Sequence, residues 1–78
     1  MATKKRRAGD KVSMTSRVAK NVRRYLKECG LSQSELARAS GLTPNYISDT
    51  INGEHLPNVA ALVVIAGALG VTLDDLIA

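Results

Sequence analysis

Four glycines, Gly30, Gly41, Gly53 and Gly70, each follow a short stretch with helical periodicity. Because glycine readily adopts the left-handed backbone conformation that ends helices, each of them is expected to stop one. The alternating runs of β-branched and aromatic residues that are typical of strands are missing. The spacing therefore predicts a compact all-α fold made of five short helices.

The first helix is predicted to begin at Ser16, as its cap, and to run to Glu28. An apolar stripe at three- and four-residue steps follows it. Cys29 continues the stripe, so it is interpreted as a core residue rather than as a reactive thiol. The stripe consists of Val18, Val22, Tyr25, Leu26 and Cys29.

Two further helices have clear starts. The segment Ser32-Gln33-Ser34-Glu35 is a capping box, in which a serine hydroxyl and a glutamate carboxylate bond each other's backbone N–H groups. This second helix is expected to stop at Gly41. Thr43 is the next cap, and Pro44 occupies the first helical position, where its missing N–H does no harm. The third helix is predicted to run to Asn52.

The last two helices are predicted over residues 59–69, capped by Asn58, and over residues 73–77, capped by Thr72. No charged residue occurs in the fourth helix. An apolar face on a small protein usually marks a partner, so we expect a homodimer rather than a merely alanine-rich surface. The predicted dimer contacts are Val64, Ala68, Leu73, Leu76 and Ile77.

Positive charge is concentrated in residues 1–28, which hold ten of the eleven Lys and Arg and two acids, giving +8; residues 29–78 hold one Arg and five acids, giving −4. Such a basic half is typical of proteins that bind polyanions, although charged runs also occur on solvated surfaces. Residues 1–14 are interpreted as a flexible basic arm and residues 15–78 as the domain. The arm cations expected to contact a DNA backbone are Lys4, Lys5, Arg6 and Arg7.

The residue inventory argues against an enzyme. No Ser/His/Asp set, phosphate loop or pair of buried carboxylates is apparent, so neither catalysis nor a small-molecule substrate is expected. One cysteine, Cys29, and one histidine, His55, do not make a usual zinc site, and no cofactor is expected. His55 is interpreted as an exposed loop residue. A lone cysteine and the lack of an apolar export or membrane segment predict a cytoplasmic protein.

The connection between the second and third helices is very short. It consists of Ser40-Gly41-Leu42, which leaves the two helices crossed at a steep angle. Ala37 is small enough to let the third helix pack across the second. The pair is therefore predicted to form a helix-turn-helix, whose third helix shows a polar face to solvent.

These caps, glycines and apolar positions resemble those of the lambda-repressor-like (phage Cro/repressor-type, XRE-type) helix-turn-helix domain. The resemblance covers residues 17–77 without a gap. The residues that carry it are Leu31-Ser32-Gln33-Ser34-Glu35-Leu36-Ala37, Ser40-Gly41-Leu42-Thr43, Tyr46-Ile47-Ser48, Asn52-Gly53, Pro57, Leu62, Ile65-Ala66, Leu69-Gly70-Val71 and Leu73-Asp74-Asp75-Leu76.

The resemblance implies a regulator of transcription, a repressor, that binds double-stranded DNA and reads the major groove with the third helix. It implies DNA-backbone contacts by Gln33, Ser34 and Asn52. A two-fold dimer implies a palindromic operator with half-sites about one helical turn apart. Asn45 suits adenine, and Asp49 suits the amino group of cytosine. The base-facing residues that it implies are Thr43, Pro44, Asn45, Ser48 and Asp49.

Some positions depart from the family's pattern. Many relatives pair an Arg late in the first helix with a Glu of the third, whereas this chain has Leu26 and Ile51 there, and we expect apolar packing to replace the ion pair. Pro44 stands where the family often places Gln. No Lys or Arg lies between Thr43 and Gly53, so the arm and the first helix are expected to supply much of the attraction to DNA.

A protein-interaction module, such as an antitoxin or a phage protein that binds a protein partner, is the alternative function. Fold does not by itself decide between the two. Specific DNA binding predicts a steep loss of affinity with salt together with a lasting preference for one sequence. Flat and sequence-blind binding would favour the protein partner.

Overall fold

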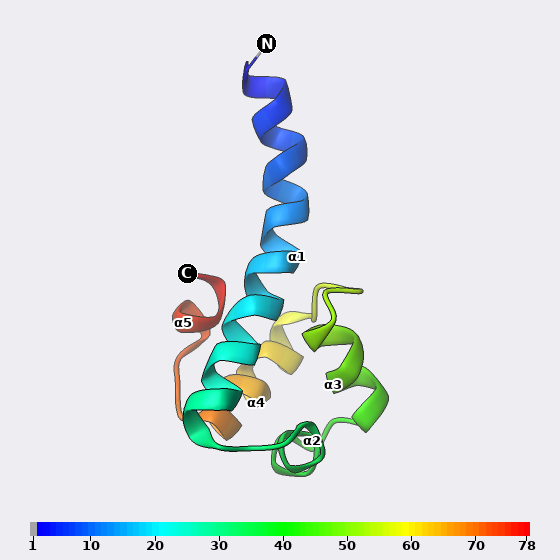
Figure 1. The fold of residues 1–78 in the computed structure, drawn as a ribbon, viewed down its shortest axis with the longest axis vertical. Helices are drawn as coiled ribbons and strands as arrows, with labels where there is room; N and C mark the ends of the chain where they lie inside the picture. Colours follow the sequence, from blue (N-terminus) through cyan, green and yellow to red (C-terminus); the bar gives the residue numbers. More distant parts are fainter. Residues whose placement is uncertain (1) are drawn as a thin grey trace.

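Five helices form the regular structure of the computed structural model, which describes the backbone of residues 2–78 and the side chains of residues 14–78. No strand occurs within residues 2–78. The predicted all-α fold is therefore confirmed (Figure 1). The helices are α1 (Ala2–Cys29), α2 (Gln33–Ser40), α3 (Pro44–Ile51), α4 (Val59–Leu69) and α5 (Leu73–Ile77).

The first helix begins earlier than the sequence predicted. Ser16 lies inside α1 and is not its cap. Lysine and arginine favour helices, and no proline precedes Ser16, so the local sequence allows the longer helix. The predicted flexible arm over residues 1–14 falls almost wholly outside the described side chains and stays a prediction. The same applies to the arm cations Lys4, Lys5, Arg6 and Arg7.

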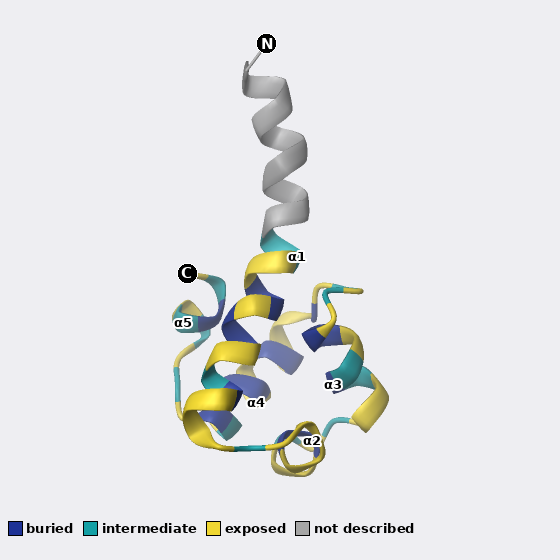
Figure 2. Ribbon diagram, viewed as in Figure 1, coloured by how far each residue is buried: buried dark blue, intermediate teal, exposed yellow. Residues whose placement is uncertain are grey.

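The helices pack around α1. The helices α3, α4 and α5 all contact α1, while α2 packs against α3 and α4. In Figure 1, α3 and α5 lie on either side of α1. Figure 2 shows that the buried residues lie on the sides of the helices that face one another. As a result, α3 is held from two directions, by α1 and by α2.

The core is aliphatic, and every helix contributes to it. At least one apolar side chain from each helix is fully buried, with no exposed surface. This pattern follows from the apolar positions that recur at helical spacing, because each short helix must bury one face to be stable. These six residues, in helix order, are Val18, Val22, Leu36, Ile47, Ile65 and Leu76.

The caps predicted for α2, α3, α4 and α5 are present. At the start of α2, the Ser32 hydroxyl accepts from the Glu35 N–H at 3.1 Å, and the Ser32 N–H donates to the Glu35 carboxylate at 2.8 Å. The backbone hydrogen bond from Ser32, followed by that of its hydroxyl, lowers the pKa of Glu35 from its usual value. Thr72 and Asp75 form the same capping box at α5. These local interactions confirm where α2 and α5 begin.

Cys29 corrects an expectation from the sequence. It is exposed rather than buried in the core, and its thiol donates to the Leu69 carbonyl at 3.4 Å. Cys29 is the last residue of α1, and Gly30 turns the chain immediately after it. The apolar stripe therefore extends past the end of the core.

Candidate nucleic-acid interface

A tight turn joins α2 to α3. Gly41 has a φ of 76°, a conformation that is strained for residues with a side chain. The N–H groups of Gly41 and Leu42 both donate to the Ala37 carbonyl, at 3.0 and 3.1 Å. Leu42 is half-buried and packs against the core. This turn fixes the angle at which α3 leaves α2.

The next residues start α3. Thr43 has an extended backbone, and its hydroxyl accepts from the Tyr46 N–H at 3.1 Å. Pro44 follows in the first turn of the helix. Because the Thr43 oxygen acts as an acceptor in this cap, its hydroxyl hydrogen remains available to donate to a ligand.

The two faces of α3 differ sharply. Ile47, Thr50 and Ile51 are buried against the rest of the domain. The opposite face is polar and lies at the surface (Figure 2). This face is formed by the predicted base-facing residues, of which Thr43, Pro44, Asn45 and Asp49 are exposed and Ser48 is half-buried.

Cations of α1 lie beside the start of α2. Gln33 and Ser34, the predicted backbone contacts, are both exposed there. Gln33 shares a shallow depression of about 620 Å³ with residues of α1 and α3. We call it the basic depression; it is lined by Lys20, Arg23, Arg24, Leu26, Lys27, Gln33 and Ile51.

The cations of the basic depression were not among the predicted site residues. Lys20, Arg24 and Lys27 are spaced by four and three residues, which places them on one helix face. That spacing is the sequence feature that could have identified them. Their proximity to Gln33 could not be predicted, because it depends on how α1 packs against the motif.

The end of α3 is supported by a polar cluster. The Thr50 hydroxyl donates to the Tyr46 carbonyl at 2.9 Å. Since its one hydrogen is used there, the Thr50 oxygen accepts from Nε2–H of His55, also at 2.9 Å. The His55 ring lies 4.6 Å from that of Tyr46. His55 is thus half-buried and structural, which corrects its interpretation as an exposed loop residue.

Two other predicted positions can be placed. Leu26 and Ile51 are both buried in the same core cluster and both line the basic depression, as apolar packing in place of an ion pair requires. Asn52 is exposed at the end of α3, where its side-chain amide donates to the Ser48 hydroxyl at 3.4 Å. Asn52 therefore lies at the surface beside the predicted base-facing residues.

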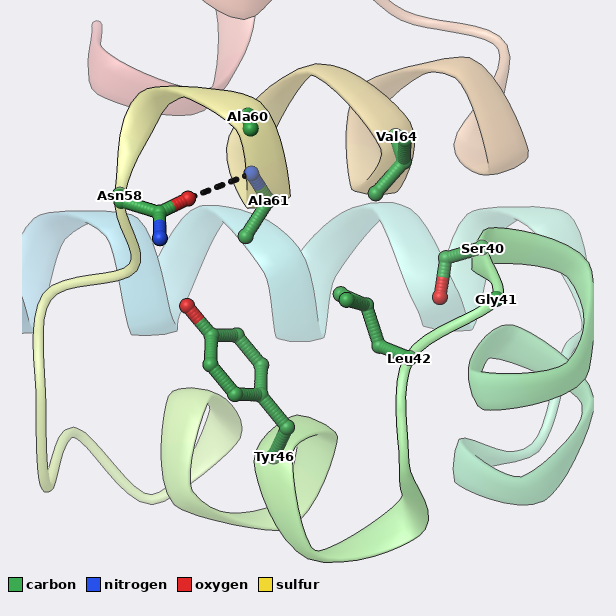
Figure 3. Close-up of a pocket in the computed structure, with 8 residues that line it drawn as sticks. All are labelled: Ser40, Gly41, Leu42, Tyr46, Asn58, Ala60, Ala61 and Val64. Carbon is green, nitrogen blue, oxygen red and sulfur yellow. Dashed lines mark hydrogen bonds between the residues drawn. The ribbon is translucent and has the colours of Figure 1, made fainter.

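An apolar depression of about 380 Å³ lies between the helix-turn-helix and α4. In Figure 3, Leu42 of the turn and Tyr46 of α3 point toward α4. Ala60, Ala61 and Val64 line the α4 side.

Residues 22–76 match the family model described as helix-turn-helix. The chain belongs to the XRE-type helix-turn-helix family. The match runs from the middle of α1 into α5, so it includes both helices of the motif and those that support them. Regulators of this family bind double-stranded DNA, and this helix-turn-helix protein is accordingly a DNA-binding regulator.

Two relatives agree with this family. The helix-turn-helix protein is 35% identical over 66 residues to the "Uncharacterized HTH-type transcriptional regulator y4dJ" of Sinorhizobium fredii. The aligned residues cover 85% of this chain and 86% of the relative. It is 40% identical over 50 residues to the "ImmF control region 10 kDa protein" of Bacillus phage phi105, covering 64% of this chain and 56% of the phage protein. The chain thus spans little more than half of the phage relative.

Among the described residues there is neither a metal-binding group nor a membrane span. No three or more His, Cys, Asp or Glu residues gather there in a way that could hold a metal ion. None of the described helices has both the length and the apolar character to cross a bilayer.

Proposed function

We propose that this helix-turn-helix protein is a sequence-specific repressor of transcription that reads the DNA major groove with α3. The observation that carries the proposal is the polar, exposed face of α3 on a helix whose opposite face is fully buried. Such a helix presents side chains of fixed position to a groove. The names of the two relatives, a transcriptional regulator and a phage control-region protein, support a role in gene control.

Base contacts are assigned to the exposed face of α3 and to its cap. The Asn45 amide is suited to a bidentate contact with adenine, and the Asp49 carboxylate can accept from a cytosine amino group. Ser48 and Thr43 supply hydroxyls that bond either kind of base edge. Pro44 can make only apolar contacts, such as with a thymine methyl group.

Backbone contacts are assigned to residues flanking α3. Gln33 and Ser34 lie in the first turn of α2, where free N–H groups favour a phosphate. Asn52 lies at the other end of α3. Because α3 has no cation, the attraction to phosphates comes from α1 and from the basic arm. Such a protein acts in the cytoplasm, on nucleoid DNA.

The test begins with selection of an operator from random double-stranded DNA, followed by titration with that operator at rising salt. We expect Asn45→Ala to weaken operator binding about 5- to 150-fold, which corresponds to 1–3 kcal/mol for a bidentate base contact. Binding to unrelated DNA serves as the internal control and should not change. Failure to recover any preferred sequence would favour the protein-partner alternative.

The operator is proposed to be palindromic and to be bound by a homodimer, whose contacts lie on α4. Val59, Val63 and Val64 are 65%, 51% and 40% exposed, which is unusual for large apolar side chains. Ala60 and Gly67 are exposed on the same face. Together these five residues are named the α4 face. It has no charge that could attract an acidic or basic partner, so a second copy with the same apolar face suits it.

The structure changes the predicted set of dimer contacts. Val64 belongs to the α4 face and is kept, and Ala68, Leu73 and Ile77, which are half-buried, are kept at the edge of the proposed interface. Leu76 is completely buried inside the single chain and is removed from it. Leu76 and Ile77 are adjacent apolar residues, and in a helix of five residues the sequence does not show which of them points inward.

Val63→Glu tests the dimer. A carboxylate in the centre of an apolar interface has no partner, so we expect the dimer dissociation constant to rise at least about tenfold. Sedimentation of the protein across a concentration series measures it. Ala39→Glu, which adds the same charge to an exposed alanine of α2, is the control and should leave the oligomeric state unchanged. Equal sedimentation of wild type and Val63→Glu would exclude this interface.

A further inference from the structure

One hydrogen bond links α1 directly to the end of α3. Nη1 of Arg23 donates to the main-chain carbonyl of Ile51 at 2.6 Å. The two residues are 28 positions apart in sequence, and the contact is partly buried. Arg23 also lines the basic depression beside Gln33. The Arg23 guanidinium therefore connects α1, which carries it, with the end of α3.

With this bond, each of the last four carbonyl groups of α3 has a hydrogen-bond donor. The last carbonyls of a helix have no partner within it and must find donors elsewhere. Three of them in α3 bond backbone N–H groups of the following loop, and Arg23 supplies the donor for the fourth. The backbone N–H groups of Asn52, Glu54 and Gly53 donate to the carbonyls of Ser48, Asp49 and Thr50 at 2.9, 2.9 and 3.2 Å, and the Arg23 guanidinium donates to that of Ile51.

Arg23 also supplies charge that α3 lacks. The carboxyl end of a helix carries partial negative charge, which a cation in the last turn stabilises. The last turn of α2 contains Arg38, whereas that of α3 has no basic residue. Since α3 has only eight residues and would be marginal alone, a cation from another helix has a large share in holding its end.

We propose that Arg23 is a positioning residue that sets the orientation of α3 for base recognition. The turn at Gly41 fixes the start of α3, and Arg23 fixes its end against α1, so the face with Asn45 and Asp49 keeps one orientation. This inference rests on the proposed function, since it concerns the helix that reads DNA. A simple phosphate contact by Arg23 is the competing role.

The two roles differ in specificity and in salt dependence. Arg23→Met retains most of the side-chain length and removes the donor and the charge. Lys20→Met makes the same kind of change one turn earlier, in the same depression, at an exposed residue. Binding of each variant to the selected operator and to unrelated DNA is measured over a range of salt concentrations.

We expect Arg23→Met to lower the ratio of operator to non-specific affinity about tenfold, with little change in the salt dependence of non-specific binding, whereas Lys20→Met leaves the ratio unchanged. A ratio unchanged in Arg23→Met, together with a loss of about one in the slope of log affinity against log salt, would show a phosphate contact and overturn the proposal. If Arg23→Met does not fold, Arg23→Lys, which retains one donor, is expected to lower the ratio to a smaller extent with the slope unchanged.

A measurement without DNA separates this inference from the proposed function. In Arg23→Met, hydrogen exchange of the Asn52, Gly53 and Glu54 amides should be at least several-fold faster, because the end of α3 frays. In Lys20→Met it should match wild type. If exchange is faster in Arg23→Met but the wild-type protein selects no operator, Arg23 holds the end of α3 and the proposed reading of DNA is wrong. If exchange is unchanged in Arg23→Met, Arg23 does not hold the end of α3.

Discussion

Replacing Ile47 with alanine is expected to lower the free energy of unfolding by about 2–5 kcal/mol, through lost burial and the cavity that remains. Ile47 is fully buried and is the α3 residue that faces the centre of the core. Small domains are stable by only about 5–15 kcal/mol, so operator binding should be largely lost at 37 °C. Urea denaturation followed by circular dichroism measures the change.

Two variants on α3 serve as controls. Ile47→Val keeps most of the volume and should reduce stability by about 0.5–1.5 kcal/mol. Asn45→Ala, on the exposed face, should alter stability by no more than about 0.5 kcal/mol while weakening operator binding. An Ile47→Ala protein that unfolds at the wild-type urea concentration and still selects the operator would contradict the assignment of the two faces.

Replacing Lys4, Lys5, Arg6 and Arg7 together with glutamine is expected to weaken binding to all DNA on the order of 100-fold at low salt. If each cation neutralises one phosphate, the slope of log affinity against log salt becomes shallower by about 3.6. The ratio of operator to non-specific affinity should stay the same, because phosphate contacts carry no sequence information. Fluorescence anisotropy across a salt series measures both quantities.

The matched control retains every charge. Exchanging lysine for arginine and arginine for lysine at the same four positions should leave the slope close to that of wild type. A quadruple glutamine variant with the wild-type slope would show that these residues are only a solvated tail. In that case the cations of the basic depression would have to supply the attraction to phosphates.

Features of the fold that depend on neighbouring residues could be predicted from the sequence. The capping box of Ser32 and Glu35 and the start of α3 at Thr43 involve residues three apart, and the structure has both. Gly41 ends α2 because its backbone has the left-handed conformation that glycine readily adopts. The helix-turn-helix was therefore predictable from residues 32–52.

Features that depend on tertiary contacts could not be predicted in the same way. The bond from Arg23 ends on a main-chain carbonyl, which any residue at position 51 would offer, so no sequence pattern marks it. Whether Cys29 and Leu76 are buried depends on where helices end against the core. His55 was missed because its partner, Thr50, is a buried polar residue whose role appears only once α3 has formed.

The uncharged stretch around α4 separates two kinds of evolutionary change. Residues 56–73 contain no Asp, Glu, Lys or Arg, while the polar face of α3 ends before them. Substitutions at Asn45 or Asp49, the proposed base-reading residues, leave Val59, Val63 and Val64 of the proposed dimer interface unchanged. Under the proposed function, such proteins can therefore evolve to bind new DNA sequences while each still dimerises with its own copies, and they can change dimer partner without losing their DNA sequence.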